Sequence, residues 1–325
     1  MTDLSSIVKA YDIRGVVPDQ LNAEIARALG AAFARFTRAD RIVVARDMRE
    51  SGVELGAAFA EGVTAQGVDV VDAGLGSTDL LYYAAGSMDV PGAMFTASHN
   101  PAKYNGIKLC LSGARPVGQD SGLAQVRDEA ETFLDGEVPS DGTPGTISTR
   151  DVLSDYAAYM RSLVHDLSTI SPLKVVVDAG NGMGGHTVPS TFAGLPLELT
   201  PMYFELDGSF PHHEANPIDP ENLRDLQLKV QEVGADIGLA FDGDADRCFV
   251  VDERGQIVSP STLTALIAAR ELEREPGATI IHNLITSRSV PAVVEELGGK
   301  AVRTRVGHSF IKAEMARTGA VFGGE

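Results

Sequence analysis

The sequence Gly92-Ala93-Met94-Phe95-Thr96-Ala97-Ser98-His99-Asn100-Pro101 predicts a short strand that ends in a tight polar loop. Small and β-prone residues form the strand, and Asn100-Pro101 prevents the chain from continuing as strand or helix. The loop presents one hydroxyl group, that of Ser98, beside the imidazole of His99. Because a serine hydroxyl is a weak nucleophile at neutral pH, a catalytic role for Ser98 requires a group that activates it.

A second loop, far along the chain, can supply that group. Asp242, Asp244 and Asp246 alternate between the segments 235–241 and 248–251, which both read as buried strands. Open α/β sheets bind ligands at the carboxyl ends of their strands, and three carboxylates can converge there on one hard divalent cation. A cation beside a serine oxygen is suited to holding and transferring a phosphoryl group.

The spacing of the acidic loop also admits a calcium-binding EF-hand, in which Glu253 would be the twelfth residue. That motif requires glycine at its sixth position and helices on both sides. The sixth position is Arg247 and the flanks are strands, so we exclude an EF-hand. The Arg247 guanidinium can instead pair with the carboxylates or clamp a phosphate.

The composition is that of a multi-domain globular protein, with 325 residues of which 44% are hydrophobic. A net charge of −18 argues against nucleic acid and anionic membranes as partners. The amino terminus lacks a signal-peptide pattern and no apolar run could span a membrane, so we expect a cytoplasmic protein. Cys110 and Cys248 stand in apolar runs, which predicts two buried thiols rather than a disulfide framework.

Strand-like and helix-like segments alternate along the chain, which predicts α/β domains with parallel or mixed sheets. The predicted strands are 41–45, 68–71, 106–111, 174–177, 278–282, 301–305 and a last one that enters Phe322. The predicted helices are 52–66, one capped by Thr78, 152–167, one from Pro260, 290–298 and 309–317. Residues 136–145 read as a linker, and the glycine-rich turn 180–185 favours tight strand-to-helix packing over phosphate binding.

Five motifs together resemble those of the α-D-phosphohexomutases, in the order that this family has them. The motifs are residues 11–15 (YDIRG), 96–108 (TASHNPAKYNGIK), 178–182 (DAGNG), 242–247 (DGDADR) and 322–325 (FGGE). The first of them is closest to the phosphomannomutase/phosphoglucomutase branch. The resemblance implies three successive mixed-sheet α/β domains of similar topology, 1–140, 150–256 and 257–325, with the active-site cleft between them. It also implies that the family's fourth, C-terminal domain is absent, so we expect the chain to be a truncated fragment with impaired activity.

The resemblance further implies an isomerase that interconverts hexose 1-phosphate and hexose 6-phosphate through a phosphoserine and a hexose 1,6-bisphosphate. Mg²⁺ would be held by Ser98, Asp242, Asp244 and Asp246. The implied catalytic residues are Ser98, His99, Lys108 and Arg14, and the implied substrate-binding residues are Arg247, Arg288, His308 and Glu325. The sequence does not rank the proton-transferring groups, does not separate mannose from glucose phosphates, and leaves a monomer or a homodimer open.

Two other functions fit the same residues. A metal-dependent sugar phosphatase would release phosphate without isomerisation. A non-catalytic phosphosugar-binding fragment would bind hexose phosphates without turnover.

Overall fold

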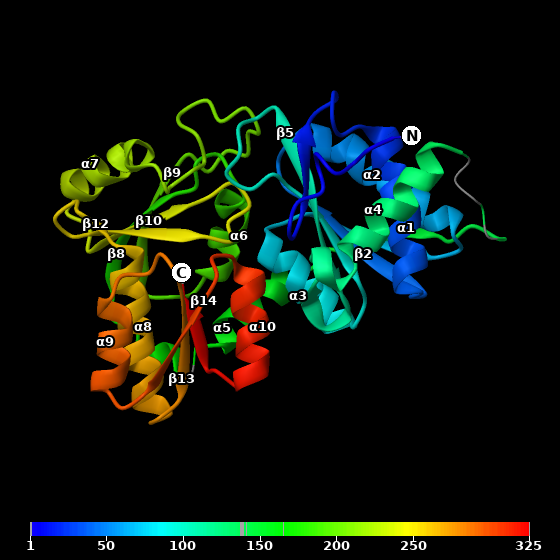
Figure 1. The fold of residues 1–325 in the computed structure, drawn as a ribbon. Helices are drawn as coiled ribbons and strands as arrows, with labels where there is room; N and C mark the ends of the chain where they lie inside the picture. Colours follow the sequence, from blue (N-terminus) through cyan, green and yellow to red (C-terminus); the bar gives the residue numbers. More distant parts are fainter. Residues whose placement is uncertain (1, 137–139, 141, 165, 325) are drawn as a thin grey trace. The chain divides into compact units, whose positions relative to one another are not determined.

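The computed structural model describes residues 2–136, 140, 142–164 and 166–324, which form two compact units, Met1–Gly255 and Gln256–Glu325. In these ranges, no helix has the length and apolar character needed to cross a membrane. Figure 1 shows the ribbon coloured along the sequence, with strands and helices alternating in both units.

The first unit begins with a mixed sheet. Its strand order is β1-β5-β4-β2-β3-β7, and β6 pairs with the outer part of β5. These strands are β1 (Ile13–Val16), β2 (Arg41–Arg46), β3 (Asp69–Leu75), β4 (Gly92–Phe95), β5 (Tyr104–Leu111), β6 (Arg115–Pro116) and β7 (Ile147–Thr149). Strand β4 runs parallel to β2 and antiparallel to β5. Ser98 lies in the turn that follows β4, at the carboxyl end of that strand.

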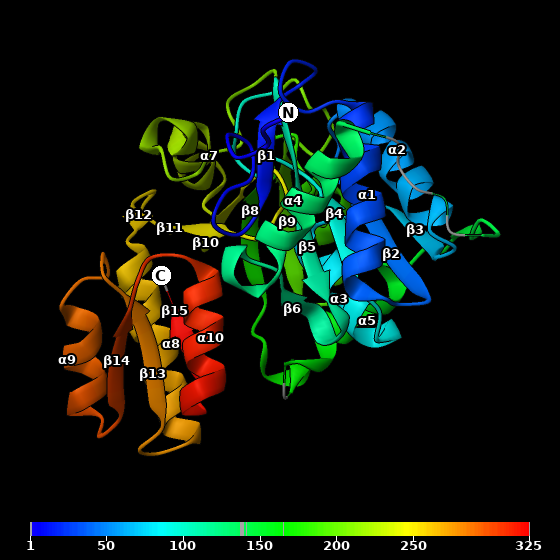
Figure 2. The same ribbon diagram turned by 45° about the vertical axis from the view of Figure 1, so that its right-hand side comes forward.

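Helices cover both faces of this sheet, as Figure 2 shows. They are α1 (Ala23–Thr37), α2 (Ser51–Ala65), α3 (Thr78–Met88), α4 (Leu123–Leu134) and α5 (Leu153–Ser162). Successive side chains of a strand point to opposite faces of the sheet, so alternate residues of β2 pack against the helix layer on one face or the other. Ile42 and Val44 pack in the core with α1, α2 and α4, whereas Val43 and Ala45 pack in the core with α3.

The first unit also contains strands in the order β11-β10-β8-β9, again a mixed arrangement. The elements are β8 (Leu173–Asp178), α6 (Gly184–Thr191), β9 (Leu197–Met202), α7 (Arg224–Val233), β10 (Ile237–Phe241) and β11 (Cys248–Asp252). The acidic loop joins β10 to its antiparallel neighbour β11. Four short 3₁₀ helices lie at Ser112–Ala114, Gln119–Ser121, Leu167–Thr169 and Pro220–Leu223.

The turn after β8 packs as the sequence predicts. A Cβ atom on Gly185 would lie 2.2 Å from the backbone oxygen of Phe204, and one on Gly182 would lie 2.7 Å from that of Gly243. Both distances are far below van der Waals contact, so these positions accept only glycine. The glycines therefore serve close packing.

The second unit has a parallel sheet of strand order β14-β13-β15 and three helices. Its elements are β12 (Ile257–Val258), α8 (Pro260–Arg274), β13 (Thr279–Asn283), α9 (Ser289–Glu296), β14 (Lys300–Thr304), α10 (His308–Thr318) and β15 (Phe322–Gly324). Ala268, Leu272, Ile280 and Val294 form its buried core. The predicted α/β fold class is confirmed by the three sheets, whereas the predicted domain limits stay a prediction.

Three local predictions are wrong. Ser77, not Thr78, caps α3, because the Ser77 hydroxyl oxygen accepts a hydrogen bond from the Leu80 amide at 3.1 Å. Cys110 is buried, but Cys248 is exposed at the start of β11, a strand with one buried residue where β8 has four. Strands β10 and β11 are accordingly partly buried rather than fully buried. Of the predicted linker 136–145, residues 137–139 and 141 lie outside the described residues.

We predict that Gly30→Ala destabilises the first unit, because α1 and α2 touch backbone to backbone. A Cβ atom on Gly30 would lie 2.1 Å from the Phe59 oxygen, and one on Gly62 would lie 2.0 Å from the Arg27 oxygen. Overpacking of this kind lowers the free energy of unfolding by about 2–3 kcal/mol. Denaturation in urea measures it.

The matched control is Gly86→Ala on α3, where the nearest atom to a new Cβ is 3.9 Å away. Because alanine favours a helix over glycine, this change raises stability by up to about 1 kcal/mol. Equal effects of the two substitutions would contradict the close helix contact.

Candidate active site

Ser98 and the acidic loop meet in the structure although 144 residues separate them. The Ser98 hydroxyl donates a hydrogen bond to Oδ2 of Asp242, with an oxygen–oxygen distance of 2.8 Å. Both side chains are fully buried. Ser98 has a φ of 51°, in the left-handed region, and its amide donates to the Thr96 hydroxyl oxygen at 2.9 Å. The predicted convergence of the two loops is confirmed.

The close approach depends on Gly243, between Asp242 and Asp244. A Cβ atom at this position would lie 2.4 Å from the backbone oxygen of Ser98. Any side chain there would push the two loops apart, so glycine is required by the contact itself.

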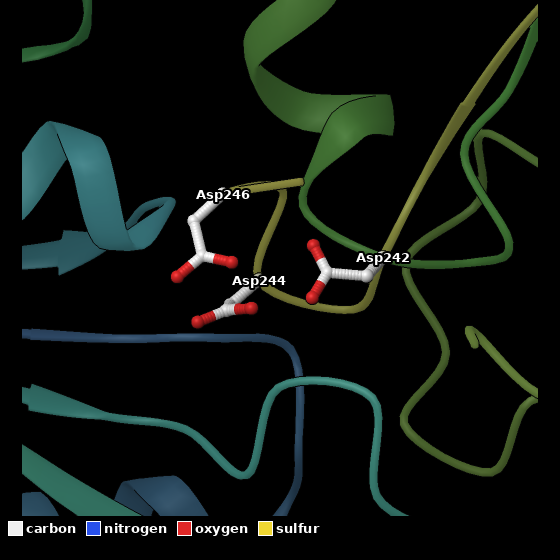
Figure 3. A group of neighbouring side chains, drawn as sticks. All are labelled: Asp242, Asp244 and Asp246. Carbon is white, nitrogen blue, oxygen red and sulfur yellow. The ribbon is translucent and has the colours of Figure 1, made fainter. Parts of the chain in front are cut away.

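The three aspartates of the loop converge on one point. One carboxylate oxygen from each of them lies within 4.8 Å of the other two, and Figure 3 shows the side chains directed toward a common region. Oδ1 of Asp244 is buried and has no hydrogen-bond partner among the described residues. An unpaired buried carboxylate oxygen is costly, whereas a hard cation such as Mg²⁺ takes oxygen ligands of this kind. The donor set therefore fits a divalent metal.

Two cations offset the negative charge of the loop. Lys108 of β5 donates from Nζ to Asp244 at 2.6 Å and to Asp246 at 2.7 Å. Nε of Arg247 lies 3.0 Å from Oδ2 of Asp242, and its guanidinium also donates to the Ser98 hydroxyl oxygen. Arg247 thus links the acidic triad to the Ser98 hydroxyl.

The charges shift the pKa values of these groups in different directions. Burial and the charges of Asp244 and Asp246 raise the pKa of Asp242 well above its usual range. For Asp244, burial alone would raise the pKa, but the neighbouring Lys108 outweighs it and the net shift is downward. Burial would lower the pKa of Lys108, but Asp244 and Asp246 raise it overall, so the side chain is an ammonium at neutral pH.

His99 is neutral at neutral pH. Burial, with the charges of Arg247 and Arg14, lowers the pKa of its imidazole to about 4. Its Nδ1 accepts a hydrogen bond from Arg247 at 2.8 Å and lies 3.3 Å from the Ser98 hydroxyl oxygen. The ring consequently holds Arg247 beside the Ser98 hydroxyl.

Arg14 of β1 reaches the same loop. Its Nη1 donates to the Asn100 side chain at 2.8 Å, and its Nη2 donates to Asp12 at 2.5 Å. Its Nε is buried and has no partner in the part of the chain that the structure describes. A charged donor of this kind is suited to an anionic ligand.

The remaining predicted substrate-binding residues belong to the second unit. Arg288 directly precedes α9. His308 begins α10, and its side chain and Glu325 lie outside the described residues. Their assignment to substrate binding stays a prediction.

Sequence reasoning missed three polar residues of the site. The Thr78 hydroxyl donates to Asp244 at 2.5 Å, and its amide donates to the Asp244 backbone oxygen at 3.1 Å. Asp47 and Arg49 are buried beneath the Ser98 loop, and Arg49 donates to the Ser98 backbone oxygen at 3.0 Å. For Thr78 the sequence offers one signal, the Ser77-Thr78 pair at the start of a predicted helix, and this pattern predicts a helix cap rather than a partner for Asp244.

A polar cluster holds the turn that supports the acidic loop. Nε2 of His213 lies 2.9 Å from Oδ2 of the buried Asp178, and the Met183 amide donates to the Gly243 oxygen at 2.9 Å. Burial would lower the pKa of His213, but the hydrogen bond and charge of Asp178 raise it overall. The protonated form of His213 is therefore favoured in the folded state.

The comparisons with known proteins agree with this geometry. Models of the phosphoglucomutase/phosphomannomutase alpha/beta/alpha domains I, II and III match residues 5–132, 155–255 and 259–325. The chain belongs to the phosphoglucomutase/phosphomannomutase family.

Similar members of this family come from several bacteria. A phosphomannomutase of Salmonella montevideo is 40% identical, and the match covers 98% of this chain and 70% of the relative. A phosphomannomutase/phosphoglucomutase of Pseudomonas aeruginosa is 39% identical over 99% of this chain and 68% of its own length. The crystal structure of a family member from Burkholderia thailandensis is 38% identical, with a TM-score of 0.90 over all of this chain and 71% of that chain.

We predict that Asp244→Asn weakens Mg²⁺ binding, because it removes the charge of the carboxylate that has the unpaired oxygen. The dissociation constant should rise by at least about tenfold, since even residues that only support metal ligands contribute that much. Titration calorimetry with magnesium chloride measures it. The control is Asp236→Asn, just before β10, where the carboxylate accepts from the Lys174 amide. An unchanged Mg²⁺ affinity in Asp244→Asn would count against the site.

The raised pKa of His213 predicts a pH-dependent stability. The pair with Asp178 stabilises the fold fully below the unfolded-state pKa of histidine, about 6.5, and this contribution is lost as pH rises through the folded-state value. The stability difference between the native chain and His213→Gln should therefore shrink from pH 6 to pH 9. Urea denaturation at several pH values measures it, and a difference that grows with pH would contradict the pairing.

Proposed function

We propose that this chain is a phosphohexomutase, which interconverts the 1-phosphates and 6-phosphates of mannose or glucose. The single observation that carries the proposal is the buried Ser98 hydroxyl, which lies between Asp242 of the acidic triad and the Arg247 guanidinium. The family membership supports it, because the relatives at about 40% identity are named as mutases of these sugars. Phosphate rests on Ser98, and a hexose 1,6-bisphosphate is the intermediate.

Ser98 acts as acceptor and donor of the phosphoryl group. In the forward half-reaction a sugar hydroxyl oxygen loses its proton to a base and bonds to phosphorus, and the bond from phosphorus to Ser98 Oγ breaks. Negative charge develops on that oxygen, which then takes up a proton to restore its hydroxyl. The Arg247 guanidinium contacts Ser98 Oγ, so it stabilises this charge where it arises. Asp242 accepts from the restored hydroxyl and orients it for the return transfer.

The charges of the site support Mg²⁺ as its metal. Three carboxylates face the cations Lys108 and Arg247, and a phosphate on Ser98 adds about −1.5 to −2 charges. Asp242, Asp244 and Asp246, with an oxygen on Ser98, would hold the ion. When bound, Mg²⁺ neutralises charge on the transferring group.

The other cationic residues hold and position anions. Lys108 and Arg14 are hydrogen-bond donors beside the triad and the Ser98 loop, and Arg14 has an unpaired Nε to offer. His99 touches Ser98 Oγ and holds Arg247. We assign the hexose phosphate itself to Arg247 together with Arg288, His308 and Glu325. The domain limits 1–140, 150–256 and 257–325 are part of the same proposal.

The phosphatase alternative differs from the mutase in the acceptor of the phosphoryl group, which is water instead of a sugar hydroxyl. The relatives at about 40% identity are named as mutases, which favours the sugar hydroxyl as acceptor.

We predict that Ser98→Ala abolishes interconversion of mannose 1-phosphate and glucose 1-phosphate with their 6-phosphates. Removal of a nucleophile lowers kcat by roughly 10³-fold or more. Coupled assays, with a trace of hexose 1,6-bisphosphate present, measure turnover. Intact mass shows whether one phosphoryl group is added to the native chain and none to the variant.

The control for this experiment is Ser87→Ala, which changes an exposed serine of α3. It should keep native turnover and phosphorylation. If the chain releases inorganic phosphate without isomerisation, it is a phosphatase rather than a mutase. If it binds sugar phosphates without turnover, it is a sugar-phosphate-binding protein.

A further inference from the structure

Arg49 is a buried arginine whose guanidinium is fully occupied. The residue is 1% exposed and lies between β2 and α2. An arginine side chain has five N–H donors, and all five are used here. Nε donates to Asp47 at 3.3 Å, Nη1 donates to the backbone oxygens of Pro101 and Tyr104, both at 3.0 Å, and Nη2 donates to those of Ser98 at 3.0 Å and Asn100 at 2.6 Å.

The carbonyl groups that Arg49 binds span the whole loop from Ser98 to Tyr104. Asp47 holds the start of the same loop, because its amide donates to the Phe95 oxygen at 2.9 Å and its carboxylate accepts from the Thr96 hydroxyl. Asp47 also accepts from the Arg49 amide at 2.9 Å. The two residues act as one framework beneath the nucleophile loop.

The segments that pack near the acidic loop also hold Arg49 in place. The guanidinium lies over the ring of Phe210, 5.1 Å from its centroid. A Cβ atom on Gly208 would lie 2.8 Å from Cα of Arg49, so the two backbones are in contact. Met48 packs in a buried cluster with Met183 and Phe210. The position of Arg49 is therefore tied to the segment that supports Asp242.

The Ser98 loop needs such a support. Ser98 has a left-handed φ of 51°, which is unfavourable for a residue with a side chain and persists only where the surroundings enforce it. Phosphoryl transfer needs Ser98 Oγ at a fixed place beside Asp242, and a displacement of about 1 Å can lower a rate roughly 100-fold.

We propose that Arg49 is a positioning residue for phosphoryl transfer, and that it acts by fixing the backbone of residues 98–104 relative to Asp242. It does not touch the sugar or the reacting oxygen. The inference rests on the proposed function for its kinetic consequence, but its structural content, the order of the Ser98 loop, stands without it.

The first test is Arg49→Lys, which keeps the charge but concentrates three donors on one atom, so it cannot serve four carbonyl groups. We expect kcat to fall roughly 100-fold while KM for the hexose 1-phosphate changes less than about threefold. The matched control is Arg161→Lys, an arginine that also binds backbone oxygens, those of Ser190 and Thr191, away from Ser98. It should leave kcat near the native value.

Hydrogen exchange provides a readout that does not need activity. In Arg49→Lys, peptides covering residues 96–106 should exchange at least about tenfold faster, because hydrogen bonds that hold the loop are lost. Peptides from α1 and α4 should keep their native rates. If Arg49→Lys does not fold, Asp47→Asn is measured instead, with the same expected pattern at smaller amplitude.

The outcomes separate this inference from the proposed function. A native chain that is inactive refutes mutase turnover by this chain only, and loop exchange alone then decides on Arg49. Unchanged loop exchange in a folded Arg49→Lys overturns the inference. A rise in KM at constant kcat also overturns it, because that result would make Arg49 a substrate-binding residue.

Discussion

Repulsion among three carboxylates is the constraint on which the site depends. Asp242, Asp244 and Asp246 have oxygens within 4.8 Å of one another, and the first two are fully buried. Burial strengthens the repulsion, because the low dielectric screens it poorly. Lys108 on β5 and Arg247 at the end of the loop offset part of it, and the Thr78 hydroxyl and the Ser98 hydroxyl supply hydrogen bonds. The same arrangement draws β5, α3 and the Ser98 loop toward the acidic loop.

The sequence predicted the site residues that belong to short motifs. Ser98, the three aspartates and Arg247 stand in two such motifs, and their types alone suggest a nucleophile, a metal and an anion. The fold class was also accessible, because alternating β and α segments favour parallel or mixed sheets. The predicted elements around β2, α2, β8 and β13 agree with the structure to within a few residues.

The buried residues that support the Ser98 loop and the acidic loop could not be predicted in this way. Arg49 and Asp47 act through carbonyl groups about fifty residues away, and no local pattern distinguishes a buried arginine from a solvated one. The prediction that Thr78 caps a helix was wrong because Ser and Thr serve both as helix caps and as hydrogen-bond donors to carboxylates, and the sequence does not separate the two roles. Cys248 was expected to be buried because an apolar run does not reveal how many helices cover a strand.

The contact between Gly243 and the Ser98 carbonyl oxygen separates two kinds of change that the molecule can undergo. Main-chain atoms of two loops meet there, so the spacing between the two backbones does not depend on any side-chain rotamer. Substitutions elsewhere can reshape the recognition of a sugar while this spacing stays constant.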